Sequence, residues 1–227
     1  NNVAVGANAL YTFNVASGNG YNVAVGKNAG FAVTTGTQNT LIGGLAGDAL
    51  TTGNYNVGIG YGALSGETAH GRNVAVGYRS LVSQNAGVDG NNTAVGFEAG
   101  DSVSTGSQNT LLGSESGRYL TGGSNNVVIG AFAAGHSVGT TTGSQNVILG
   151  NYADTTAADT TNANIMGFDV SGAAGFTTLG NGTADIRAQH GIITWATVYD
   201  ERYKKEIVDS KAGMALINAL SHRNYKY

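Results

Sequence analysis

The sequence predicts an all-β chain folded as a parallel β-solenoid or β-roll of about nine turns, and three observations predict it. The motif N-x-x-x-G occurs nine times, starting at Asn2, Asn22, Asn39, Asn56, Asn73, Asn92, Asn109, Asn126 and Asn146. Glycine occurs 37 times, whereas proline and cysteine are absent. Successive copies start about 17–20 residues apart, and a unit of this size is too small to bury a core alone, so it stacks on the next unit.

Each motif is expected to form one short strand. The residue after the asparagine is always Val or Thr, and the residue two places further is always Val, Ile or Leu. Most of these residues are β-branched Val, Thr or Ile, which favour strands, and residues two apart share a face, so we expect these two positions to form the core. The residue between them is also apolar or glycine. Strands that are apolar on both faces are covered on both, which predicts that another chain covers the outer face.

Corners follow the strands. The closing glycine suits a turn with positive φ or a close backbone approach, and the Ala or Ser three residues later marks a crowded turn. Short "TTG" and "STG" stretches predict the second corner. The recurring asparagines are expected to stack as a hydrogen-bonded structural ladder rather than to bind metal or sugar. After Asn2, the ladder residues are Asn22, Asn39, Asn56, Asn73, Asn92, Asn109, Asn126 and Asn146.

Three segments are expected along the chain. A worn tenth copy, "NANIMG", ends at Gly167, so residues 1–167 form the repeat domain. Residues 168–199 are a β-rich transition. Residues 200–227 begin with a charged run and continue into a short α-helix, in which Met214, Ile217 and Leu220 are three residues apart. Because the chain begins inside a repeat, we expect it to be a fragment of a longer protein.

Composition argues against several functions. A net charge of −3 offers no electrostatic basis for binding nucleic acid or an anionic membrane. The four histidines share no metal-ligand spacing and cysteine is absent, so neither a metal site nor a cofactor is expected. The acidic residues of the repeats are scattered among different units, which disfavours the paired carboxylates that a glycosidase needs.

The repeats resemble the "NTAIG/NVAVG" solenoid repeats of bacteriophage tail fibres and, less closely, the heads of trimeric autotransporter adhesins. This resemblance covers roughly residues 1–167 and rests on the nine motif copies. Both families form homotrimers, so the resemblance implies a homotrimeric fibre. It also implies a location in the virion tail.

A second resemblance begins at residue 176. The stretch "TLGNGTADIR", followed by "DERYKKEI", is similar to the junction between tail-fibre repeats and the intramolecular chaperone of tailspikes and endosialidases. That chaperone trimerises the fibre and, in many members, cuts itself off at a Ser-Asp bond. The family motif falls on Tyr199, Asp200, Arg202 and Lys204. Tyr199 replaces the nucleophilic serine, so self-cleavage is not expected here.

We therefore expect a structural virion fibre that attaches to the host surface, and not an enzyme. Its expected partners are further copies of itself, other tail proteins, and a glycan or protein receptor on the host. Candidate contact residues in loops and corners are Tyr11, Phe13, Tyr61, Tyr78, Phe97 and His136. The aromatic ones suit stacking on sugar rings or packing between chains equally well. A tailspike depolymerase fragment and a bacterial trimeric adhesin head are the alternatives.

Overall fold

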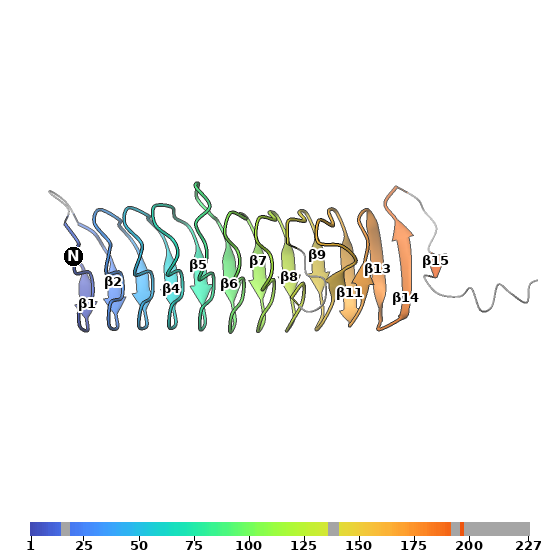
Figure 1. The fold of residues 1–227 in the computed structure, drawn as a ribbon, viewed down its shortest axis with the longest axis horizontal. Helices are drawn as coiled ribbons and strands as arrows, with labels where there is room; N and C mark the ends of the chain where they lie inside the picture. The colour runs from blue at the N-terminus through green and yellow to red at the C-terminus, as the bar shows by residue number, and fades with distance from the viewer. Residues whose placement is uncertain (15–18, 136–140, 192–195, 198–227) are drawn as a thin grey trace, which may run out of the picture.

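The chain folds into a straight rod of stacked coils (Figure 1). The computed structural model describes residues 1–14, 19–135, 141–191 and 196–197. We number the coils from their ladder asparagines, so that coil 1 begins at Asn2, coil 4 at Asn56 and coil 9 at Asn146. No helix lies among the described residues, and the expected C-terminal helix falls outside them.

Each motif forms one strand of three residues, and successive strands pair in parallel. The strands of the nine motifs are β1 (Val3–Val5), β2 (Val23–Val25), β3 (Thr40–Ile42), β4 (Val57–Ile59), β5 (Val74–Val76), β6 (Thr93–Val95), β7 (Thr110–Leu112), β8 (Val127–Ile129) and β9 (Val147–Leu149). The pairing keeps the repeat in register, since Thr93 faces Thr110 and Val95 faces Leu112. The predicted parallel solenoid is thus confirmed, and β11 (Asn164–Phe168) adds a tenth coil.

The core is formed by the central residue of each strand and not by the two residues that flank it. The central residue of each strand points inward: Ala94 in coil 6, Leu111 in coil 7 and Ile148 in coil 9 are all 0% exposed. The prediction that the two flanking residues form the core is wrong, because these residues point outward. The turn that follows each strand folds back beneath its central residue and supplies the other core side chains, including Ala99 and Leu120.

The core is interrupted at coil 4. One cluster of buried side chains ends with Leu41 and Leu50 of coil 3, and a second begins with Ala63 and Leu64. Two inward positions of coil 4 explain the break, because Gly58 stands at the strand centre and the buried Glu67 occupies the register position of Leu50. A missing side chain and a carboxylate therefore separate two apolar stacks.

The parallel stack changes at its C-terminal end. There β13 (Phe176–Asn181) pairs in parallel with β11, and β14 (Ala184–Gln189) turns back antiparallel to β13. A two-residue loop with Gly182 at φ 60° joins them, and a glycine in this first position suits a tight hairpin. The strand β15 (Ala196–Thr197) pairs with β14, while β10 (Asp154–Thr155) and β12 (Ser171–Gly172) form a small second sheet.

Candidate interaction surface

A buried column of asparagines runs along the rod. Their side chains are at most 1% exposed from Asn22 to Asn146. In coil 7, the Asn109 backbone N–H donates to Asn92 Oδ1 over 2.9 Å, and Asn109 Nδ2 donates to Gly123 O, also over 2.9 Å. Each amide oxygen thus connects a coil to the next, and most of the amide nitrogens tie the strand to the second corner. The column is internal and offers no surface to a ligand.

The corner glycines explain why the fifth motif position never varies. Gly113 has φ 134°, a conformation that L side chains rarely adopt. A Cβ on Gly113 would lie 2.6 Å from the carbonyl oxygen of Gly130 in the next coil. Both predicted reasons for glycine, positive φ and close backbone approach, hold at this corner.

The outward residues of the strands form a continuous apolar surface, which we call the strand strip. It consists of the first and third residues of β1 to β9 and of β11. Its third-position column is apolar throughout, and its exposed members include Ile42 (37%), Leu112 (45%) and Met166 (52%). Ten strands at a spacing of about 4.8 Å make the strip roughly 43 Å long. Exposed contiguous apolar surface of this extent marks an interaction site.

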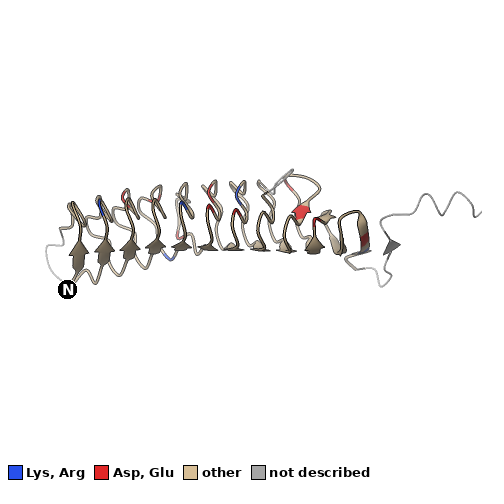
Figure 2. Ribbon diagram, turned by 90° about the horizontal axis from the view of Figure 1, so that it is seen from below, with Lys and Arg blue, Asp and Glu red and all other residues tan. Residues whose placement is uncertain are grey.

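Charged residues avoid the strand strip. In Figure 2 the strands lie along one edge of the rod and are tan from β1 to β9, whereas most red and blue segments lie on the opposite side of the coils. An interface core is depleted of charge in the same way. The strand strip is therefore the candidate interaction surface of this molecule.

The aromatic residues at the corners stack on one another. Tyr61 and Tyr78 have ring centroids 5.8 Å apart, and Tyr78 and Phe97 are 5.2 Å apart, with interplanar angles of 13° and 11°. Neighbouring rings therefore cover both faces of Tyr78, while its edge stays exposed. Stacking on a sugar ring needs an open face, so this geometry disfavours the sugar-stacking interpretation for Tyr78.

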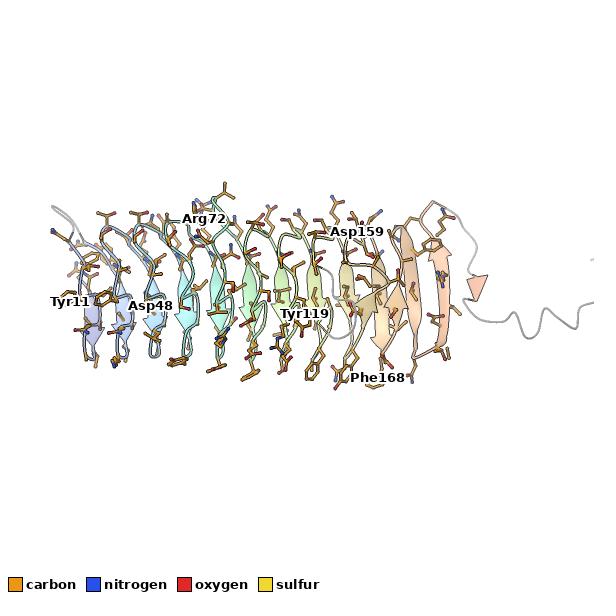
Figure 3. The ribbon with its side chains drawn as sticks, in the orientation of Figure 1. Tyr11, Asp48, Arg72, Tyr119, Asp159 and Phe168 are labelled. Carbon is orange, nitrogen blue, oxygen red and sulfur yellow. The ribbon has the colours of Figure 1, made fainter. Side chains whose placement is uncertain are left out.

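The other candidate contact residues lie in different settings. Tyr11 is 69% exposed and stacks on Phe31 with centroids 5.4 Å apart. Phe13 is partly buried against the core cluster of coils 1 to 3, so it presents little surface. Figure 3 shows Tyr11 on the first coils, while Phe168 lies at the corner edge of the rod. The expected positions His136, Tyr199, Asp200, Arg202 and Lys204 lie outside the described residues.

Arginines and acids form ion pairs between coils, which the sequence reading did not identify. Arg79 lies 3.1 Å from Asp101, and Arg118 lies 3.2 Å from Glu98. The hydrogen bond that Arg79 donates to Asp101 raises the pKa of Arg79, and the one that Arg118 donates to Glu115 raises the pKa of Arg118. Burial raises the pKa of Asp48 (Figure 3) above its ordinary value. The sequence does contain a signal for these ion pairs, because Glu98 and Glu115 occupy the same register position in adjacent coils.

The histidines of the described ranges, His70 and His190, each lie beside a polar side chain. His70 Nδ1 lies 3.2 Å from Glu67 Oε1, and His190 Nε2 lies 3.2 Å from Thr177 Oγ1 on the strand face. Within the described ranges, no three His, Asp or Glu side chains are grouped as metal ligands would be. Nor does this part of the chain contain a helix with the length and apolarity to span a bilayer.

Comparison of the chain with protein-family models, with curated proteins and with solved structures gave no match. Function is therefore inferred from the fold and its surfaces.

Proposed function

We propose that this chain forms the shaft of a virion tail fibre, in which three copies pack through their strand strips. The observation that carries the proposal is the strip itself, an uncharged and mostly apolar surface that continues through ten coils. A single chain leaves Leu112 and Met166 about half exposed, and their burial would stabilise an assembly by roughly 25 cal/mol for each Å² of apolar surface removed from water.

A second copy of the chain is the partner that fits the strip best. The apolar side chains recur once per coil, at a spacing of about 4.8 Å along the axis. A partner must offer apolar groups with the same repeat over the same length, and another copy does so by construction. The number three rests on the resemblance of the repeats to trimeric fibres. A stable interface buries about 800 Å² from each partner, and the proposal requires an interface of this size along the ten coils.

The attachment role belongs to the surfaces that the strip leaves free. The corner edges of Tyr61, Tyr78 and Phe97 are about half exposed, and the coil that carries β5 rises above its neighbours in Figure 1. We place the contact with a host glycan or protein at these surfaces. Binding of the whole protein to a glycan array, compared with a Phe97→Ala variant at the end of the ring stack, tests this part of the proposal.

The ion pairs favour a structural role over the depolymerase alternative. Glu98 and Glu115 share the guanidinium group of Arg118, and Asp101 is paired with Arg79. A glycosidase needs two carboxyl groups that face a sugar from opposite sides of a groove, whereas each of these carboxylates faces an arginine. These acids therefore suit links between coils.

Replacing Leu112 by Glu tests the role of the strip. Three buried carboxylates would meet in the middle of the assembly, so we expect the variant to sediment as a monomer at micromolar concentration, with its β-sheet circular dichroism spectrum retained. Val88→Glu is the matched control, since Val88 is 62% exposed but lies in a loop outside the strip. If Leu112→Glu and Val88→Glu sediment alike, the strip is not the interface.

A further inference from the structure

One ladder asparagine departs from the pattern of the others. Asn56 Nδ2 donates to His70 O over 3.1 Å and Asn109 Nδ2 donates to Gly123 O, so the amide reaches the carbonyl three residues before the next ladder position. In coil 5 the equivalent carbonyl belongs to Asp89, and it accepts a hydrogen bond from Asn91 Nδ2 instead. Asn73 Nδ2 is consequently buried without a hydrogen-bond partner among the described residues.

Two further unpartnered polar atoms belong to the same coils. Val33, Leu50, Val103 and Leu120 form a buried apolar column, yet between Leu50 and Val103 this column contains Glu67 and Gln84, both 0% exposed. Glu67 Oε1 accepts from the backbone N–H groups of Thr68 and His70, and Gln84 Oε1 accepts from Asn92 Nδ2. Within the described chain, neither Glu67 Oε2 nor Gln84 Nε2 has a partner.

Register and hydrogen bonds link the three buried side chains. Glu67 and Gln84 occupy one register position in adjacent coils, which places their backbones about 4.8 Å apart. Asn92 links Gln84 to Asn73, since its Nδ2 donates to Gln84 Oε1 over 2.9 Å and its backbone N–H donates to Asn73 Oδ1 over 3.1 Å. The amides of Gln84 and Asn73 therefore flank the same residue.

We propose that Glu67, Asn73 and Gln84 form a buried binding site for one water molecule. The two amide nitrogens donate to the water oxygen, and the water donates one hydrogen to Glu67 Oε2. Water is the ligand that this set selects, because two N–H donors repel a cation and the carboxylate repels an anion. About three hydrogen bonds to otherwise unsatisfied groups is the usual complement of a buried water.

Two of the three residues, Asn73 and Gln84, belong to coil 5, which is the longest of the coils that the structure describes in full. The step from Asn73 to Asn92 is 19 residues, whereas the step from Asn56 to Asn73 is 17 residues. The Asp89 side chain in this loop accepts from the Gly71 N–H over 3.0 Å and lies 3.3 Å from Arg72, while the Asp89 carbonyl accepts from Asn91 Nδ2 and not from Asn73. A water in this site would accept the hydrogen bond from Asn73 Nδ2 that the Asp89 carbonyl does not accept. Coil 5 can then stack on its neighbours despite its longer loop.

A high-resolution crystal structure of the whole chain tests the site directly. We expect a density peak within about 3.2 Å of Asn73 Nδ2, Gln84 Nε2 and Glu67 Oε2. Asn109 is the internal control, because Gly123 O already satisfies its amide and no such peak is expected beside it. A direct hydrogen bond between Gln84 and Glu67 with no peak would overturn the proposal.

A double-mutant cycle gives a second readout. Glu67→Leu and Gln84→Leu each leave a water with two partners, so each single variant is expected to melt below the wild type. The double variant restores the apolar column of coils 3 and 7 and is expected to melt above both single variants. Melting losses that simply add would show that the two side chains share no water.

Discussion

At the scale of single residues, backbone geometry restricts which residues can occupy the corners more than side-chain chemistry does. In coil 7 the sequence Gly113-Ser114-Glu115 turns the chain with φ values of 134° at Gly113 and 55° at Glu115. A second left-handed residue, Gln108, precedes the ladder asparagine at φ 59°. Only glycine fits at Gly113, because the next coil passes within van der Waals distance. Gln108 and Glu115 adopt a less favourable conformation, and each donates its backbone N–H to the preceding coil, at Gly90 O and Phe97 O.

Two glycine-to-alanine substitutions should therefore have opposite effects. Gly113→Ala places a methyl group 2.6 Å from Gly130 O at φ 134°, and we expect a loss of more than about 2 kcal/mol in the free energy of unfolding. Gly58→Ala places a methyl group 3.3 Å from its nearest neighbours, at a register position where Ala24 and Ala75 are accommodated. This change should stabilise the protein by about 0.5–1 kcal/mol. Urea unfolding measures both, and a stabilising Gly113→Ala would contradict the corner geometry.

The asparagine column makes a separate prediction. Asn109→Leu leaves the Asn126 N–H and the Gly123 carbonyl without partners in a buried site, so we expect a loss of about 1–3 kcal/mol for each group. Asn85→Leu is the control, because Asn85 is exposed and its side chain accepts a single 3.3 Å bond from Thr68 Oγ1. Thermal unfolding of the two variants should differ clearly. Equal melting would mean that the column contributes nothing to stability.

At the scale of the strand and coil, the spacing of the motifs determines which residues pair between strands. It does not determine which face of the strand points into the core. The 17-residue step from Asn92 to Asn109 places Thr93 opposite Thr110, and the structure has this pairing. Which face points inward could not be derived from the strand alone, since apolar residues occupy both faces. The polar substitutions were the available signal, because Thr40, Thr93 and Thr110 all occur in the outward column while the inward column contains only Gly, Ala, Val, Ile or Leu. The water site was beyond sequence reasoning, because it depends on which carbonyl the longer loop turns away.

The two columns of the strand strip should lie at different distances from the axis of the proposed trimer. The third-position column is purely apolar, whereas the first contains three threonines and Asn164, and an interface is apolar at its centre and polar at its rim. We therefore expect the third-position column to lie nearest the threefold axis. The chain has no cysteine, so single Leu112→Cys and Thr110→Cys variants give an unambiguous comparison.

Oxidised Leu112→Cys should run as a covalent dimer on a denaturing gel, with one chain in three left unpaired. Thr110→Cys should cross-link much less, because its thiols would lie further apart than the roughly 4–7 Å between Cα atoms that a disulfide spans. Preferential cross-linking of Thr110→Cys would leave the trimer intact as a proposal but would place the other column on the axis.

At the scale of the whole molecule, the rod has one apolar side and one charged side. The strand strip extends along the first, and the ion pairs of Arg79 and Arg118 lie across the coils at the corners. Each coil packs only on its neighbours, and every added coil extends the same buried core along the axis. Lateral association through the strip is the way in which such a rod acquires a second layer of buried apolar surface.

The most direct test of this account is the mass of the unmodified protein in solution. Sedimentation equilibrium at micromolar concentration should give a single species with three times the mass of one 22.9 kDa chain. A folded species of 22.9 kDa under the same conditions would contradict the central claim, because it would show that the strand strip is stable when exposed to water.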